Sequence, residues 1–116
     1  MNYTEEQQFL YDVMTIAVEG GINDWAAIRN VKRDEELNVL QFDCRDSEDK
    51  TAHWEGIDAD RVKTAILHII AWNVEIRNTT RQLIVESWNE KDAGILDADD
   101  CDCIIQVAAF GEIVFG

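Results

Sequence analysis

The chain has 116 residues, a length typical of a single domain over residues 1–116, and 47% of them are hydrophobic, which excludes a disordered chain. Its 24 acidic residues against 10 Lys and Arg give a formal charge of −14 at pH 7. Such a charge excludes nucleic-acid binding through basic residues, and it excludes docking on an anionic membrane surface.

The start of the chain has neither the basic residues nor the apolar stretch of a signal peptide. No apolar run approaches the ~20 residues of a membrane span. We therefore expect a cytoplasmic protein with no membrane contact. Three cysteines without a regular spacing favour reduced thiols over disulfides.

The first predicted element is a helix over residues 5–19. Thr4 and Gln7 have the spacing of a capping box, and apolar residues recur on one helical face from Phe9 to Val18. The pair Gly20-Gly21 is interpreted as the signal that stops this helix.

Three strands are expected next, over residues 25–33, 36–45 and 51–54, with polar turns between them. In the second, Phe42 and Cys44 alternate with polar residues, which is typical of a strand with one buried face. Leu37 and Val39 fall in the opposite phase, so we expect a β-bulge near Val39 or Leu40.

Asp58 is a good N-cap for a second helix, whose apolar stripe extends to Ile76. We expect a break near Asn78, because an uninterrupted helix would turn Arg77 toward the core, where an unpaired polar group is costly. Thr79 and Gln82 have capping-box spacing for a third helix over residues 80–91, with Leu83, Ile84 and Trp88 facing inward.

Asp97 caps a fourth predicted helix, in which Cys101, Ile104 and Ile105 share an apolar face and Gly111 marks the end. The predicted fold class is therefore α+β. A small antiparallel three-stranded meander sheet packs with about four helices, in the order α-β-β-β-α-α-α.

Two groups of residues could suggest a metal site. Asp97, Asp99, Asp100 and Asp102 are close in sequence, but the twelfth position from Asp97 is Ala108, where an EF-hand has Glu. Acids at a helix start are stabilised by the helix dipole without a metal. We therefore interpret these acids as structural.

Zinc and nucleophilic catalysis are also weighed for Cys44, Cys101, Cys103, His53 and His68. A Cys-x-Cys pair in a helix points its sulfurs about 200° apart, which does not suit a zinc knuckle. Neither histidine lies in a catalytic motif, and Gly20-Gly21 follows a helix, whereas a phosphate loop precedes one. We expect buried structural thiols, no catalytic residues, no metal and no cofactor.

The acidic residues are concentrated in two blocks. Residues 34–60 contain ten acids against Arg45 and Lys50, and residues 86–102 contain seven acids against Lys91. Between the blocks, residues 61–81 carry a net charge of +3. The simple interpretation is a solvated, solubilising surface. The functional interpretation is a surface complementary to a basic macromolecule, imitating the charge of duplex DNA.

Two segments resemble a known group of proteins. Residues 19–25 (Glu-Gly-Gly-Ile-Asn-Asp-Trp) and residues 110–116 (Phe-Gly-Glu-Ile-Val-Phe-Gly) resemble small acidic proteins encoded by actinobacterial phages and mobile elements. Phe115 stands where that group would have Tyr, and the region of the second strand is variable in it. The group has no assigned chemistry, so the resemblance implies a context: a phage or plasmid product that acts inside a host bacterial cell.

The sequence hypothesis is therefore a non-enzymatic inhibitor that binds a host protein with a basic surface, of the anti-restriction or anti-CRISPR kind, as a DNA mimic. Two alternatives remain: a small metal-binding module or enzyme, and a structural or oligomer-forming phage protein. The oligomeric state, monomer or homodimer, stays open. The residues expected to contact the partner are Asp43, Asp46, Glu48, Asp49, Glu55, Asp58, Asp60, Trp25 and Trp54.

Two further expectations belong to this hypothesis. A tryptophan that anchors an interface is expected at the surface beside the acids, and Trp25 and Trp54 are the candidates. Reversing the charges of Asp46, Glu48 and Asp49 together is expected to leave the melting temperature nearly unchanged, because exposed single charges contribute little to stability.

Overall fold

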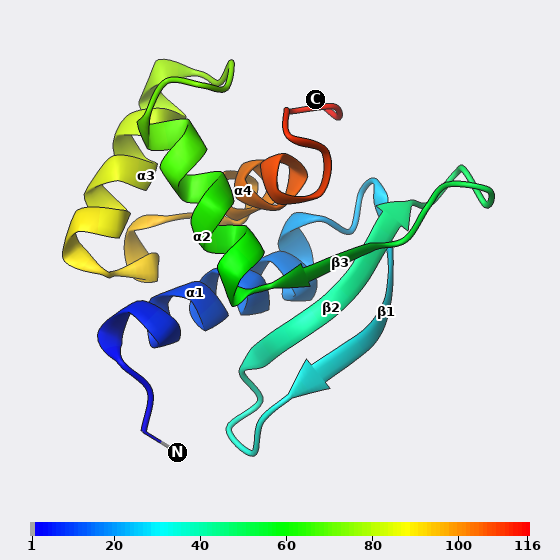
Figure 1. Ribbon diagram of the computed structural model, residues 1–116, viewed down its shortest axis with the longest axis horizontal. Helices are drawn as coiled ribbons and strands as arrows, with labels where there is room; N and C mark the ends of the chain where they lie inside the picture. The colour runs from blue at the N-terminus through cyan, green and yellow to red at the C-terminus, as the bar shows by residue number, and fades with distance from the viewer. Residues whose placement is uncertain (1) are drawn as a thin grey trace.

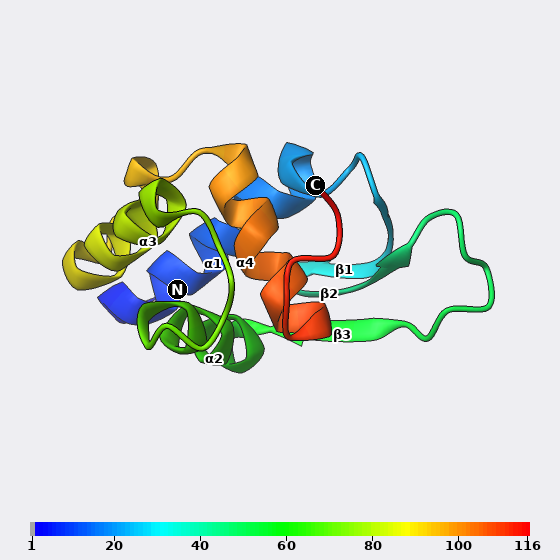
Figure 2. The ribbon, with the colours of Figure 1, turned by 90° about the horizontal axis from the view of Figure 1, so that it is seen from above.

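In the computed structural model, which describes residues 2–116, helices pack against a three-stranded antiparallel sheet (Figure 1, Figure 2). The elements are α1 (Glu5–Ile16), the π-helical turn η1 (Ala17–Gly21), β1 (Ala26–Arg33), β2 (Val39–Asp46), β3 (Glu55–Asp58), α2 (Ala59–Ile70), α3 (Asn78–Glu90), the 3₁₀ turn η2 (Ala93–Ile95) and α4 (Ala98–Phe110). The predicted α+β class and element order are confirmed. No helix within residues 2–116 combines the length and the apolar character needed to cross a membrane.

The sheet is a meander with β2 in the middle. One face is buried, because Val39, Phe42 and Cys44 of β2 and Ile57 of β3 are all 1% exposed or less. Helix α1 packs on that face against β2, and α2 and α4 pack against β3. Figure 2 shows the helices gathered on one side, with the β2–β3 loop projecting away from them.

Two β-bulges interrupt the pairing of β1 with β2. Leu40 is an extra residue in β2, since its neighbours Val39 and Gln41 pair with adjacent residues of β1. This confirms the predicted bulge, which turns Val39 and Phe42 toward the same buried face despite their odd spacing. The second bulge lies in β1 at Asn30, whose φ of 53° is left-handed, and the apolar pattern gives no sign of it.

The third strand begins at Glu55, so the strand predicted at residues 51–54 is wrong. Asp49 Oδ1 accepts hydrogen bonds from the backbone N of Thr51 at 3.0 Å and from its hydroxyl at 2.7 Å. These local hydrogen bonds hold the backbone in a turn, and they compete with the ladder hydrogen bonds that a strand would make with β2. Residues 51–54 therefore belong to the projecting β2–β3 loop.

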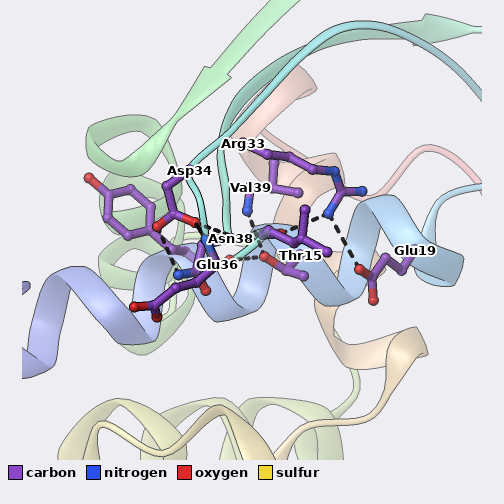
Figure 3. Close-up of polar contacts among 9 residues, drawn as sticks. Thr15, Glu19, Arg33, Asp34, Glu36, Asn38 and Val39 are labelled. Atoms are coloured by element: carbon purple, nitrogen blue, oxygen red, sulfur yellow. Dashed lines mark hydrogen bonds and ion pairs between the residues drawn. The ribbon is translucent and has the colours of Figure 1, made fainter. Parts of the chain in front are cut away.

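The β1–β2 hairpin is attached to α1 by side-chain hydrogen bonds (Figure 3). Asp34 accepts hydrogen bonds from the Tyr3 hydroxyl at 2.8 Å and from the backbone and side-chain nitrogens of Asn38 at 2.9 Å. The Thr15 hydroxyl in α1 accepts from the backbone N of Val39 at 2.9 Å. Asp34 is therefore a structural residue of the hairpin tip, and its hydrogen bonds with Asn38 and Tyr3 lower its pKa.

The first helix forms as predicted at its start, where Thr4 and Gln7 make a complete capping box. Its α-helical part ends earlier, at Ile16, and the chain continues as a π-helical turn to Gly21. A Cβ atom on Gly21 would lie 2.6 Å from the backbone O of Ala98, at the start of α4. Gly21 therefore permits η1 to pack closely on α4. This role comes in addition to the helix stop that was predicted for Gly20-Gly21.

The break between the second and third helices is confirmed, but its limits differ from the prediction. Helix α2 is capped by Asp58 and ends at Ile70, so Ile76 lies in the connection. The predicted cap at Thr79 is wrong, because α3 already begins at Asn78. Leu83 is exposed, whereas it was predicted to face inward.

The buried side chain of Arg81 in α3 explains where this connection turns. Its guanidinium donates hydrogen bonds to the backbone O of Ile69 at 3.1 Å and of Val74 at 2.6 Å. These bonds tie the end of α2 and the connection to α3, so the chain reverses before the predicted position.

Helix α4 agrees with its prediction. Asp97 and Asp100 form a reciprocal capping box, and Gly111 ends the helix with a φ of 79°. Cys101 is fully buried, like Cys44 in β2, and burial raises the pKa of both thiols to about 12. The predicted burial of these two thiols is confirmed.

Candidate functional site

The two segments that carry the resemblance, residues 19–25 and 110–116, lie against one another beside α4. The rings of Trp25 and Phe115 are stacked, with centroids 4.9 Å apart and planes 9° apart. The ring of Phe110 packs on the same indole, at 5.5 Å. This aromatic cluster joins the loop before β1 to the end of the chain.

Gln106 of α4 holds the C-terminal segment in place. Its side-chain oxygen accepts hydrogen bonds from the backbone N of Val114 at 2.9 Å and of Phe115 at 2.8 Å. Its side-chain nitrogen donates to the backbone O of Phe115 and to Asp102 Oδ1, both at 3.1 Å. The side-chain amide of Gln106 is fully buried and makes four hydrogen bonds, so it fixes the C-terminal segment in one position.

Asp102 connects the same helix to Trp25. Its Oδ1 atom accepts a hydrogen bond of 2.7 Å from the indole Nε1 of Trp25. Burial raises the pKa of Asp102, while its hydrogen bonds with Trp25 and Gln106 oppose the rise. The same atom, Oδ1, accepts both hydrogen bonds. Asp102 also lines a cleft beside α4.

A cleft of about 680 Å³ opens where these segments meet the start of α4 and the α2–α3 connection. Trp25, Ile76, Ile113 and Phe115 supply its apolar surface. Its acidic residues, called here the cleft acids, are Asp24, Glu75, Asp99 and Asp102. Arg77 is the only basic side chain among the described residues that line it, so the cleft attracts cationic groups.

Cys103 also lines this cleft. Burial, followed by the charges of Asp102 and Asp100, raises the pKa of its thiol to about 11. The thiol is therefore protonated at neutral pH and is a weak nucleophile, since the thiolate is the reactive form. Within residues 2–116, no three side chains among His, Cys, Asp and Glu are grouped so as to hold a metal ion.

The acids predicted to contact a partner do not line the cleft. They are distributed over the sheet, the β2–β3 loop and the first turn of α2: Asp43, Asp46, Glu48, Asp49, Glu55, Asp58 and Asp60. The sequence block 34–60 is divided as well, because the hairpin tip and the β2–β3 loop lie at opposite ends of β2 (Figure 1). This block is not one continuous surface.

Several of these acids stabilise local structure. Asp43 pairs with Arg29 at 3.2 Å, Glu55 pairs with Arg61 at 3.3 Å, and Asp58 caps α2. Asp46 Oδ1 accepts from the backbone N of Glu48 at 2.9 Å, and Asp49 holds the turn at Thr51. Asp46 and Asp49 are therefore not free surface charges, contrary to the premise of the expectation that their charges can be reversed without loss of stability.

The predicted tryptophan anchors also need correction. Trp25 is only 6% exposed, because it packs in the aromatic cluster and bonds Asp102, so it is not a surface anchor. Trp54 is partly buried, and the guanidinium carbons of Arg29 and Arg45 each lie 4.2 Å from the centroid of its ring. Neither tryptophan presents a bare ring to a partner.

The exposed tryptophan of the described chain is Trp72, at 69%. It lies in the connection after α2, next to the stretch that lines the cleft. Sequence analysis missed it, because its spacing from Ile69 continues the apolar stripe of the predicted helix. No glycine marks the actual helix end at Ile70.

No family model, curated protein or solved structure matches this chain. The resemblance to phage and mobile-element proteins therefore stays a prediction.

Proposed function

We propose that this protein is a non-enzymatic binding protein whose partner is a macromolecule with a basic surface, and that the cleft acids form part of the contact. The observation that carries the proposal is that, in the described part of the chain, most basic side chains are engaged in contacts within the protein, whereas most acidic side chains make no ion pair. Within residues 2–116, seven of the ten Lys and Arg side chains donate hydrogen bonds to other residues. They are Arg29, Arg33, Arg45, Arg61, Lys63, Arg81 and Lys91.

Many of these contacts do not neutralise a carboxylate. Arg81 and Lys91 donate to backbone carbonyls and lie over tryptophan rings. Within residues 2–116, ion pairs involve only four of the 24 acidic side chains: Glu6, Glu19, Asp43 and Glu55. The remaining carboxylates give the surface a strong negative field, which accelerates association with an oppositely charged partner.

The expected partner class follows from this field and from the resemblance. A host protein that handles nucleic acid has a basic surface, because that surface must neutralise phosphates. An acidic protein bound to it would exclude DNA by competition. We therefore propose inhibition of such a host protein, of the anti-restriction or anti-CRISPR kind, as the biological role.

The test is affinity capture from a bacterial host lysate, followed by measurement of binding to the purified protein that is recovered. The first variant neutralises three cleft acids, Asp24→Asn, Glu75→Gln and Asp99→Asn. The matched control neutralises three exposed acids elsewhere, Glu5→Gln, Glu35→Gln and Glu48→Gln, so both variants change the net charge equally.

We expect the cleft variant to bind more weakly than the control, and the affinity of the parent to fall with added salt. DNA should compete with the protein for the recovered partner. An affinity that is independent of salt and unchanged in both variants would show that the acidity only keeps the protein in solution. Loss of binding in the control alone would transfer the contact to the start of α1, the hairpin tip or the β2–β3 loop.

A further inference from the structure

The backbone of Trp72 adopts a conformation that tryptophan seldom takes. Its φ is 64°, in the left-handed region. The backbone N of Trp72 donates to the O of Ile69 at 3.2 Å, and that of Asn73 donates to the O of His68 at 3.0 Å. These two bonds form a Schellman motif at the end of α2, in which glycine is the usual residue at the left-handed position. A bulky side chain here is sterically unfavourable.

The side chain of Trp72 is nevertheless held in a defined place. The guanidinium carbon of Arg81 lies 3.9 Å from the centroid of the ring, and Arg81 is itself fixed by its carbonyl contacts. Trp72 as a whole residue remains 69% exposed. A large aromatic group that is both exposed and already ordered binds a partner with a small loss of conformational entropy.

Shallow grooves flank this indole. One, of about 400 Å³, runs along α3 and is lined by Gln82, Val85, Glu86, Asn89 and Glu90. The other, of about 460 Å³, contains Val74, Glu75 and Ile76. Glu75 and Ile76 also line the cleft of the cleft acids, so the two surfaces adjoin.

Charge determines which occupant fits. Glu75, Glu86 and Glu90 line the grooves on either side of Trp72, whereas the guanidinium of Arg81 is occupied by carbonyls and by the ring. A second copy of this chain would bring its own −14 charge to the same face and be repelled. A basic segment carrying an apolar side chain fits this face, because its cations can pair with the carboxylates and its apolar side chain can pack on the indole.

We propose that Trp72 is the anchor of the partner interface, and that it receives an apolar side chain flanked by lysines or arginines of the partner protein. This inference rests on the proposed function, which supplies the basic partner. It replaces Trp25 and Trp54 as the expected tryptophan anchors, and it places the contact at the α2–α3 connection.

The test uses two synthetic peptides of equal length and charge. One contains only lysine and serine, and in the other a single leucine replaces a central serine. Their affinities are measured by fluorescence anisotropy at low and high salt. We expect the leucine peptide to bind the parent about tenfold more tightly, the factor for partial burial of one leucine side chain.

The variant Trp72→Gly removes the indole and places glycine at the left-handed position, so the fold is expected to persist. In this variant the affinity ratio of the two peptides should fall to about one. Trp72→Phe should keep most of the difference. Leu37→Gly is the matched control, because Leu37 is 65% exposed, has a φ of 67° and lies beside Glu35 and Glu36.

Each result decides the proposal. A ratio that falls only in Trp72→Gly supports the anchor. Salt-dependent binding of both peptides with no gain from leucine, or an equal change in Leu37→Gly, overturns the anchor and leaves the acidic binding function standing. If neither peptide binds at low salt, the anchor and the proposed function both fail.

Discussion

At the scale of single residues, arginine serves here as an internal donor to backbone carbonyls. Arg61 donates to the O of Ala108 at 2.7 Å and of Ala109 at 3.2 Å, near the end of α4, and to the O of Gly56 at 2.8 Å. The last carbonyls of a helix lack partners within the helix, so a cation there stabilises the helix end. The net positive stretch at residues 61–81 is therefore not a free basic patch, because the guanidinium groups of Arg61 and Arg81 are engaged by backbone carbonyls.

The three thiols should differ in reactivity. Cys44 and Cys101 are fully buried, with thiol pKa values raised to about 12, whereas Cys103 is partly exposed in the cleft, with a pKa raised to about 11. In the folded protein we expect a disulfide reagent to modify Cys103 first and slowly. The rate should rise about tenfold per pH unit between about pH 7 and 9, following the thiolate fraction.

The measurement is the time course of thiol modification followed by mass spectrometry. Cys103→Ser should remove the first phase, and Cys101→Ser should not. Rapid modification of all three thiols in the folded protein at neutral pH would contradict the burial of Cys44 and Cys101.

At the scale of elements, the starts of helices could be predicted from the sequence better than their ends. The caps of Thr4, Asp58 and Asp97 bond backbone atoms only three residues away, so a short pattern reveals them. Helix α2 ends at Ile70 with Trp72 in place of glycine at the left-handed position that follows, and this end depends on Arg81, which comes from the next helix. Local patterns do not contain that information.

The candidate site was predictable only in part, for the same reason. Its acids are visible in the sequence, but the cleft requires Trp25 to meet Asp102, which is 77 residues away along the chain. Sequence reasoning placed Trp25 at the surface because nothing near it in sequence indicates its partners. Residues of both segments that carry the resemblance line the cleft, but the sequence analysis drew only a biological context from them.

The adjacent glycines of η1 should respond differently to alanine. Gly21→Ala would place a Cβ atom 2.6 Å from the backbone O of Ala98, which cannot move without shifting α4. We expect this variant to lose about 1–3 kcal/mol of unfolding free energy, as in other overpacked sites. Gly20→Ala meets nothing within 4 Å, and should gain about 0.4–1 kcal/mol through the lower entropy of the unfolded chain.

Urea unfolding of both variants measures this difference. The two changes are chemically identical and adjacent, so intrinsic helix propensity cannot separate them. Equal effects at the two positions would show that η1 does not approach α4 as closely as the structure indicates.

At the scale of the whole molecule, the carboxyl groups fall into two classes with opposite effects on stability. Burial raises the pKa of Asp100 and Asp102 above the ordinary value of 3.8, so their ionisation opposes folding. Hydrogen bonds lower the pKa of Asp34, Asp43 and Asp49 below that value, so their ionisation favours folding. The net charge of −14 adds a general repulsion at neutral pH.

These shifts predict a maximum of stability in mildly acidic solution. As pH falls from neutral through the raised folded pKa values of Asp100 and Asp102, the folded state binds protons more tightly than the unfolded chain, and stability rises. Below the ordinary value of 3.8, protonation of Asp34, Asp43 and Asp49 removes their contribution, and stability falls. The measurement is the unfolding free energy in urea from about pH 7 to 3, at low and high salt.

Asp102→Asn tests the molecular origin of the rise. Asparagine keeps an oxygen that can accept from Trp25 and Gln106, but it does not titrate, so the increase toward acid pH should become smaller. Glu35→Gln changes the net charge by the same amount at an exposed position on the hairpin tip, whose charge is not among the causes of the raised pKa values of Asp100 and Asp102, and should leave most of the increase in place. Added salt screens the general repulsion more than the burial effect on Asp102, so the difference between the two variants should persist at high salt. A stability that declines steadily from neutral pH to about pH 4 would contradict the raised pKa values of Asp100 and Asp102.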